Sequence, residues 1–156
     1  MVKVMGNFIT GIESTKWQKR FLALAEFWSQ YRTCNRGAMG AVIVRGKRAI
    51  ASGYNGAPPG SKNCDDVGHA MLNEHCKRTV HAEVNAIAQA AKFGNSVDGC
   101  DIYITAFPCW DCAKLMAACG IKNVFYLRDY HPEEWEFYEP LYNQLSINFI
   151  QLKTET

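Results

Sequence analysis

The chain has 156 residues, of which 48% are hydrophobic, so it is long enough for one domain that buries about two thirds of its unfolded surface. Its 17 basic and 15 acidic residues leave a net charge of +2 without a long basic run, so the overall field does not attract nucleic acid. No apolar run approaches the roughly 20 residues of a membrane helix. We therefore expect a single soluble domain over residues 1–156, without membrane or nucleic-acid partners.

Seven cysteines are many for this length, but their number is odd and two of them stand as Cys-x-x-Cys. The N-terminus lacks a basic segment followed by an apolar secretory core. We therefore expect a reduced, cytoplasmic protein that uses its thiols to bind metal, rather than a disulfide scaffold.

The first third of the chain predicts an arm, a helix and a hairpin. Residues 1–13 show little pattern, and we expect a loose N-terminal arm. Ser14 and Thr15 are candidate N-caps of an amphipathic helix that continues to about residue 32. Two short apolar runs, 40–44 and 48–53, are separated by Arg-Gly-Lys and predict a hairpin of core strands. Prolines and glycines then predict a long connection from residue 55 to about residue 78, of a length that is usually functional or holds its own small structure.

The remaining chain alternates helices and strands. A helix is predicted from residue 81 to near Gly94, a strand at 101–105, a helix from Pro108 to Gly120 and a strand at 124–127. A helix at 133–141 and a fifth strand at 145–152 complete the prediction. Alternation of this kind indicates parallel pairing among the later strands. The expected fold class is α/β, with three layers (α/β/α) around a mixed five-stranded sheet.

Three candidate metal ligands lie at the starts of two of these helices: His81, Cys109 and Cys112. One imidazole and two thiolates suit a tetrahedral zinc ion, and three protein ligands leave the fourth position open for water. Two residues in a regular helix diverge by about 200°, so Glu83 and His81 face one site only at the helix entrance. An open position with a carboxylate beside it favours a catalytic zinc, whereas a His with Cys-x-x-Cys alone is more often a closed structural site.

The pairing of His-x-Glu with a later Pro-Cys-x-x-Cys resembles the signature of the zinc-dependent cytidine and deoxycytidylate deaminases. The Gly-Tyr-Asn-Gly turn and the long connection resemble the deoxycytidylate (dCMP) branch, because deaminases of free nucleosides lack that connection. The resemblance covers about residues 31–130 and implies a cytidine-deaminase-like fold. The further motifs that carry it are Thr33-Cys34-Asn35-Arg36, Gly53-Tyr54-Asn55-Gly56, Asn63-Cys64-Asp65 and His75-Cys76-Lys77-Arg78-Thr79.

The resemblance also implies a reaction. Zinc supplies hydroxide at neutral pH, the hydroxide attacks C4 of cytosine, and Glu83 moves the water proton to N3 and later to the departing amine. The implied reaction converts dCMP to dUMP for thymidylate synthesis in a hexamer, with dCTP as activator and dTTP as inhibitor. The alternatives are a related deaminase acting on dCTP, a free cytosine nucleoside or an RNA base, and a non-catalytic zinc module that binds nucleic acid or a protein.

Candidate substrate contacts follow from the same motifs. The resemblance implies that the Asn55 amide contacts the bound deoxynucleotide, although asparagine is also an ordinary turn residue. Tyr130 resembles a residue at the pocket mouth, and an exposed tyrosine without a function is the alternative. A phosphate needs cationic or N–H donors. The cations nearest the motifs are Arg36, Lys62 and Arg78, and the alternative for each is an ordinary solvated surface charge. Motif neighbours and these cations complete the candidate set: Tyr54, Ala82, Arg36, Lys62 and Arg78.

Five further candidate metal ligands remain: Cys34, Cys64, His69, His75 and Cys76. Some dCMP deaminases carry a second, structural zinc at cysteines that correspond to Cys34 and Cys64, and this chain keeps both. Two of the other three would complete the tetrahedron. Such an ion would pin the long connection, since structural zinc contributes on the order of 10 kcal/mol in small modules. The alternative is a set of buried reduced cysteines with a surface histidine.

Overall fold

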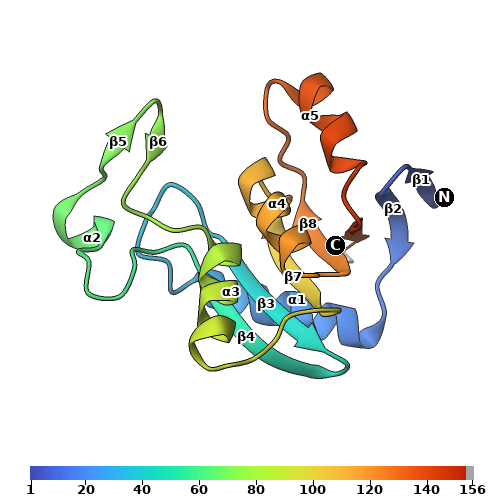
Figure 1. Cartoon of the computed structure of the whole chain (residues 1–156), viewed down its shortest axis with the longest axis horizontal. Coiled ribbons are helices and arrows are strands. Elements are labelled where there is room, and N and C mark those ends of the chain that lie inside the picture. Colours follow the sequence, from blue (N-terminus) through green and yellow to red (C-terminus); the bar gives the residue numbers. More distant parts are fainter. Residues whose placement is uncertain (154–156) are drawn as a thin grey trace.

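A computed structural model describes residues 1–153, which form a seven-stranded mixed sheet with helices on both faces (Figure 1). The strand order in the sheet is β1-β2-β9-β8-β7-β3-β4, and β5 and β6 pair separately. In chain order the elements are β1 (Lys3–Met5), β2 (Phe8–Glu13), α1 (Lys16–Ser29), β3 (Gly40–Arg45), β4 (Arg48–Tyr54), α2 (Cys64–Val67), β5 (Met71–Leu72), β6 (His75–Cys76), α3 (Ala82–Lys92), β7 (Asp101–Ala106), α4 (Trp110–Ala118), β8 (Asn123–Arg128), α5 (Trp135–Tyr142) and β9 (Asn148–Lys153).

The centre of the sheet agrees with the prediction. Strands β7, β8 and β9 are parallel, as the alternation of strands and helices indicated. Strand β3 runs antiparallel to both β4 and β7, so the predicted hairpin is confirmed. Because β3 and β7 are antiparallel, the start of β3, the end of β4 and the end of β7 all meet at one end of the sheet. The loop that precedes β3 and the loops that follow β4 and β7 therefore gather at that end.

The N-terminal segment differs from the prediction, because it is not a loose arm. Strands β1 and β2 form a hairpin, and β2 pairs in parallel with β9. Phe8 is buried, and its ring stacks on Phe149 with centroids 5.5 Å apart. The partner strand lies at the other end of the chain, so no local pattern could show the pairing. These two strands raise the number in the sheet from the predicted five to seven.

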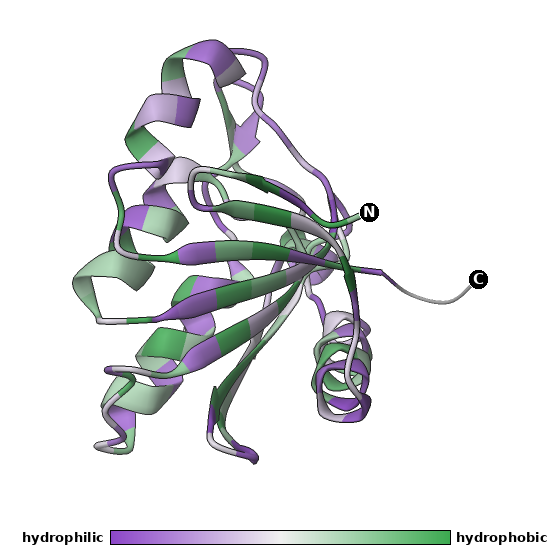
Figure 2. Cartoon of the chain, turned by 90° about the vertical axis from the view of Figure 1, so that its right-hand side faces the viewer, coloured by the Kyte–Doolittle hydropathy of each residue, from purple (hydrophilic) through white to green (hydrophobic). Residues whose placement is uncertain are grey.

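Helices lie on both sides of the sheet (Figure 2), and each face carries a separate apolar cluster. On one face α1 contributes Phe21, Leu22 and Ala25, and the ring of Phe21 lies 5.3 Å from that of Tyr103 on β7. On the other face α3 and α4 cover the sheet with residues that include Ala86 and others of the larger cluster. Helix α1 begins at the predicted cap, since the Thr15 side chain accepts from the Gln18 N–H in a capping box.

Helices α3 and α4 begin at the predicted metal ligands. His81 is the N-cap of α3 and Cys109 is the N-cap of α4. Pro108 therefore precedes the cap, two positions before the first helical residue at which proline is preferred. A side chain at Gly53 of β4 would collide with the Ala82 carbonyl oxygen, so this glycine lets the first turn of α3 lie directly on the strand.

The long connection holds its own small structure, as its length suggested. It contains α2 and the β5–β6 pair, which extends away from the body of the molecule (Figure 1). The chain turns between β5 and β6 through Asn73 and Glu74, both with positive φ.

Among the described helices, none combines the length and apolar character that a membrane crossing requires.

Candidate active site

His81, Cys109 and Cys112 converge at the end of the sheet where the loops gather. The His81 Nδ1 atom lies 3.3 Å from the Cys112 Sγ atom and 3.5 Å from the Cys109 Sγ atom. All three ligand atoms lie within 4.8 Å of one another. In a tetrahedral zinc site with Zn–N and Zn–S bonds of about 2.0 and 2.3 Å, such ligands stand about 3.5 Å apart. The geometry of the three side chains therefore fits a zinc ion.

Hydrogen bonds among these three side chains shift their protonation. The thiol of Cys112 and, secondarily, His81 lower the pKa of Cys109 to about 4, despite its burial. The same thiolate raises the pKa of His81 to about 9 by hydrogen bonding, although burial opposes this shift. Sharing a proton with Cys109 raises the pKa of the Cys112 thiol, and burial adds to the increase. The site thus concentrates thiolate and imidazole donors at two positive helix ends.

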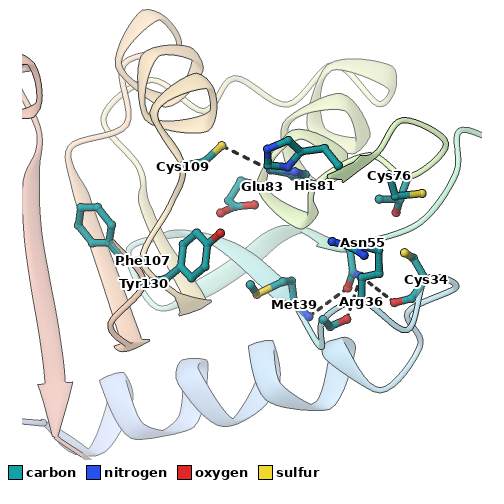
Figure 3. Close-up of a pocket in the computed structure, with 13 residues that line it drawn as sticks. Cys34, Arg36, Met39, Asn55, Cys76, His81, Glu83, Phe107, Cys109 and Tyr130 are labelled. Atoms are coloured by element: carbon teal, nitrogen blue, oxygen red, sulfur yellow. Dashed lines mark hydrogen bonds between the residues drawn. The ribbon is translucent and has the colours of Figure 1, made fainter. Parts of the chain in front are cut away.

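Glu83 stands in the first turn of α3, beside this group. It is only 8% exposed, and its carboxylate points into a pocket that His81 and Cys109 also line (Figure 3). Burial raises the pKa of the Glu83 carboxyl above its usual value, although its own backbone N–H and His81 oppose the shift. A buried carboxyl group beside the metal-binding side chains can both accept a proton and return it, as a general acid and base requires.

The pocket has a volume of about 200 Å³ and opens at the end of the sheet. Tyr130, in the loop after β8, forms part of its wall, and its hydroxyl end points toward Glu83 (Figure 3). A second hollow of about 560 Å³ shares His75, Thr79 and Tyr130 with the pocket and continues it past α4. The walls of the first pocket include Cys34, Arg36, Met39, Asn55, Cys76 and Phe107.

Asn55 lines the pocket and also holds one of its walls together. Its Nδ2 atom donates to the carbonyl oxygens of Cys34 at 3.1 Å and Gly37 at 2.9 Å. Its Oδ1 atom accepts from the Met39 N–H at 3.0 Å. Both amide protons are therefore used inside the protein, and only the second lone pair of Oδ1 remains for a ligand. The amide clamps the 34–39 loop against the end of β4.

Replacing Asn55 by alanine should lower the free energy of unfolding by about 3 kcal/mol, since each buried group left unpaired costs about 1–3 kcal/mol. Urea unfolding of the two proteins measures the difference. Asn95→Ala is the matched control, because its exposed amide makes one long hydrogen bond of 3.5 Å, and its effect should stay within about 0.5 kcal/mol. Equal stability of the Asn55 variant and the parent chain would contradict the clamp.

The other candidate substrate contacts do not gather at one place. Arg36 lines the pocket and donates to the Glu74 carbonyl at 2.8 Å. The Arg78 Nε atom donates to the Gly68 carbonyl at 3.1 Å, and Arg78 does not line the pocket around Glu83. Three further candidates also lie outside that lining: Lys62, which is exposed, Ala82, which is buried in the first turn of α3, and Tyr54, which stacks on Trp28 beside a separate hollow.

A second group of metal-binding side chains lies beside the pocket. Cys34, Cys64, His69 and Cys76 place their ligand atoms within 4.8 Å of one another, and His75 is not part of this group. The Cys34 Sγ atom lies 3.5 Å from His69 Nδ1, and the two other thiols are 3.5 Å apart. These separations suit a tetrahedral ion with thiolate and imidazole ligands. His69 Nε2 faces Asn35 Oδ1 at 2.9 Å, the kind of oriented second nitrogen that metal-bound histidines have.

Two thiols of this second group have shifted pKa values. Burial, together with hydrogen bonds to Cys76 and Cys34, raises the pKa of Cys64 to about 12. Burial also opposes ionisation of Cys76, but backbone N–H groups of Thr79 and Arg78 outweigh it and lower the pKa of Cys76 to about 6. Backbone donors thus stabilise a thiolate in this group.

Sequence reasoning missed several residues of the pocket. Phe107 and Met39 line it without belonging to any motif with a chemical group. Thr79 lines both hollows, and its Oγ1 atom is buried without a hydrogen-bond partner among the described residues. Asn85 ties α3 to the end of β4, because its Nδ2 atom donates to the Tyr54 carbonyl at 2.8 Å. Two local signals could have pointed to these residues: Phe107 stands directly before Pro-Cys-x-x-Cys, and Thr79 ends the motif that begins at His75.

Comparisons with known proteins identify the family of the chain. The family model of the cytidine and deoxycytidylate deaminase zinc-binding region matches residues 15–128. The chain is 45% identical over 130 residues to ComE operon protein 2 of Bacillus subtilis (strain 168), across 82% of this chain and 69% of that protein. It is 34% identical over 143 residues to the deoxycytidylate deaminase of Homo sapiens, across 86% and 78% of the two chains.

The same relationship appears among solved structures. The dCMP deaminase of the cyanophage S-TIM5, in complex with dCMP and dUMP, superposes with a TM-score of 0.75 at 28% identity. The match covers 90% of this chain and 99% of the cyanophage chain. The chain belongs to the cytidine and deoxycytidylate deaminase family.

Proposed function

We propose that this protein hydrolytically deaminates dCMP to dUMP. The observation that carries the proposal is a buried carboxylate, Glu83, that shares a pocket with His81 and Cys109 of a three-ligand metal group. A closed structural zinc site has four protein ligands and no use for such a carboxylate. Several relatives are deoxycytidylate deaminases, and the cyanophage enzyme binds dCMP and dUMP.

The roles of the site residues follow from their chemistry. His81, Cys109 and Cys112 would hold zinc, which lowers the pKa of a coordinated water toward neutrality when bound. Glu83 takes a proton from the water, delivers it to N3 of the pyrimidine, and later gives a proton to the departing amine. Water adds at C4 and ammonia leaves, so dCMP and water give dUMP and ammonia.

The pocket walls would bind the rest of the nucleotide. Of the three candidate cations, only Arg36 lines the pocket, so we assign it to the phosphate. Asn55 and Tyr130 line the same pocket, the first as an acceptor through Oδ1 and the second at the mouth. Lys62, Arg78, Tyr54 and Ala82 stand outside the lining, so we assign them no direct contact.

Ammonia release measured on dCMP, dCTP, deoxycytidine and a cytosine in RNA tests the substrate. We expect kcat/KM for dCMP to exceed that for deoxycytidine by about 10- to 100-fold, because a charge-assisted phosphate contact contributes about 1.5–3 kcal/mol beyond the base contacts. We also expect it to exceed kcat/KM for dCTP and for a cytosine in RNA. Faster turnover of another substrate would replace dCMP as the substrate. No ammonia from any of them, with zinc bound, would favour a non-catalytic zinc module.

We also propose that the second group holds a structural zinc through Cys34, Cys64, His69 and Cys76. It would join the 34–39 loop to α2 and β6. The family resemblance extends the proposal to a cytoplasmic homo-oligomer, a hexamer, that dCTP activates and dTTP inhibits, and to supply of dUMP for thymidylate synthesis.

A further inference from the structure

Helix α5 contains a buried tyrosine that reaches the metal-binding turn. Tyr142 is 0% exposed, and its hydroxyl donates to the Pro108 carbonyl oxygen at 2.8 Å in a buried position. Helix α5 lies beyond residues 15–128, which the family model matches. The tyrosine therefore approaches the site from a part of the chain that the deaminase motifs do not include.

The hydrogen bond from Tyr142 holds the peptide group that joins Pro108 to the metal-binding residue Cys109. The Pro108 carbonyl and the Cys109 nitrogen belong to one planar peptide group, so holding the carbonyl fixes the plane from which the Cys109 Cα atom projects. The thiol of Cys109 stands two bonds beyond that atom. Cys109 is also the N-cap of α4, where backbone angles are not set by regular helical hydrogen bonds.

Tyr142 is itself held rigidly. Its ring lies 5.2 Å from the Phe107 ring and 5.1 Å from the Trp110 ring, the residues that flank Pro108 and Cys109 on either side. On its backbone side, Asn7 in the turn between β1 and β2 donates to the Tyr142 carbonyl at 3.2 Å and to the Leu145 carbonyl at 2.6 Å. The N-terminal hairpin thus holds the end of α5 in place.

We propose that Tyr142 is a positioning residue for the metal site, which orients Cys109 through the Pro108 carbonyl. It touches no substrate, and it acts through the ligand. Groups that orient metal ligands typically change metal affinity 10- to 100-fold when they are removed. The proposal rests on the zinc site of the proposed function, and assigns α5 and the N-terminal hairpin to its support.

Tyr142→Phe tests this role, because it removes the hydroxyl and keeps the ring. Tyr126→Phe is the matched control, since Tyr126 is also buried, its ring lies 5.1 Å from Phe107, and its hydroxyl makes no hydrogen bond within residues 1–153. The full-length, zinc-loaded proteins are mixed with the chelator 4-(2-pyridylazo)resorcinol, and zinc transfer and ammonia release are followed together.

In Tyr142→Phe, the zinc ion at His81, Cys109 and Cys112, whose loss abolishes activity, should be released about 10–100-fold faster than in the parent chain. Added zinc should restore turnover. Tyr126→Phe should match the parent chain within about twofold, and zinc at the second group should leave at an unchanged rate in both. A merely structural role would lower the unfolding temperature and leave both release rates unchanged, which would overturn the proposal. Should Tyr142→Phe not fold, Asn7→Ala decides, with severalfold faster release supporting the proposal and unchanged release refuting it.

Failure of the proposed function gives a different result. If Cys112→Ser binds as much zinc as the parent chain, the metal assignment to His81, Cys109 and Cys112 is itself wrong. If the parent chain holds that zinc and Tyr142→Phe retains it equally well, only the positioning role fails.

Discussion

Replacing Glu83 by glutamine should lower kcat by at least about 10²–10⁴-fold, the usual contribution of a positioned general acid and base. Glutamine keeps the shape of the side chain but cannot accept the water proton or return it to the amine. Glu83 is not one of the three side chains that form the metal group, so zinc content should stay at the parental value. Ammonia release and metal analysis of the same preparation check both expectations.

Asp111→Asn is the matched control for this experiment. Asp111 is also a carboxylate in the first turn of a helix beside the metal group, but its side chain is 88% exposed and forms an ion pair with Lys114 at 3.0 Å. Its removal should change kcat by no more than about twofold, because exposed ion pairs contribute little. Parental turnover in Glu83→Gln would remove Glu83 from the mechanism, and loss of zinc would show that it supports the metal instead.

The second large effect concerns metal content, which should be two zinc ions per chain. Cys112→Ser should bind one zinc ion and lose turnover entirely. Serine is a poor zinc ligand, and the buried Cys112 thiol is one of the three ligands of the catalytic zinc, with His81 and Cys109. Cys64→Ser should also hold one zinc but keep measurable turnover, since Cys64 does not line the pocket. Its unfolding temperature should fall, as expected when a structural ion is lost.

Cys119→Ser provides the control for both cysteine variants. Cys119 ends α4 outside the two metal groups, so this variant should retain two zinc ions and parental activity. Metal analysis of purified, zinc-replete protein gives the stoichiometry. One zinc ion in the parent chain would exclude an ion at Cys34, Cys64, His69 and Cys76, and two ions in Cys112→Ser would contradict the assignment of that ligand.

The two metal groups differ in how far local sequence could define them. His81, Glu83 and the Cys-x-x-Cys pair stand at helix entrances, where short spacings fix the direction of each side chain, so their convergence was predictable. The second group draws on four separate segments, and its choice of His69 over His75 depends on how the chain folds between α2 and β6. No spacing rule determines that choice.

By itself, the sequence determined the order of the central elements, the hairpin, the parallel later strands and the three-ligand group with its carboxylate. Periodicity and capping are local properties, so a short stretch of chain is enough to reveal them. Only the tertiary structure decided that residues 3–13 join the sheet, that Asn55 clamps a loop, and that Tyr142 reaches Pro108. These contacts join residues far apart in the chain, and their free energy comes from burial and hydrogen bonds that exist only after the segments have met.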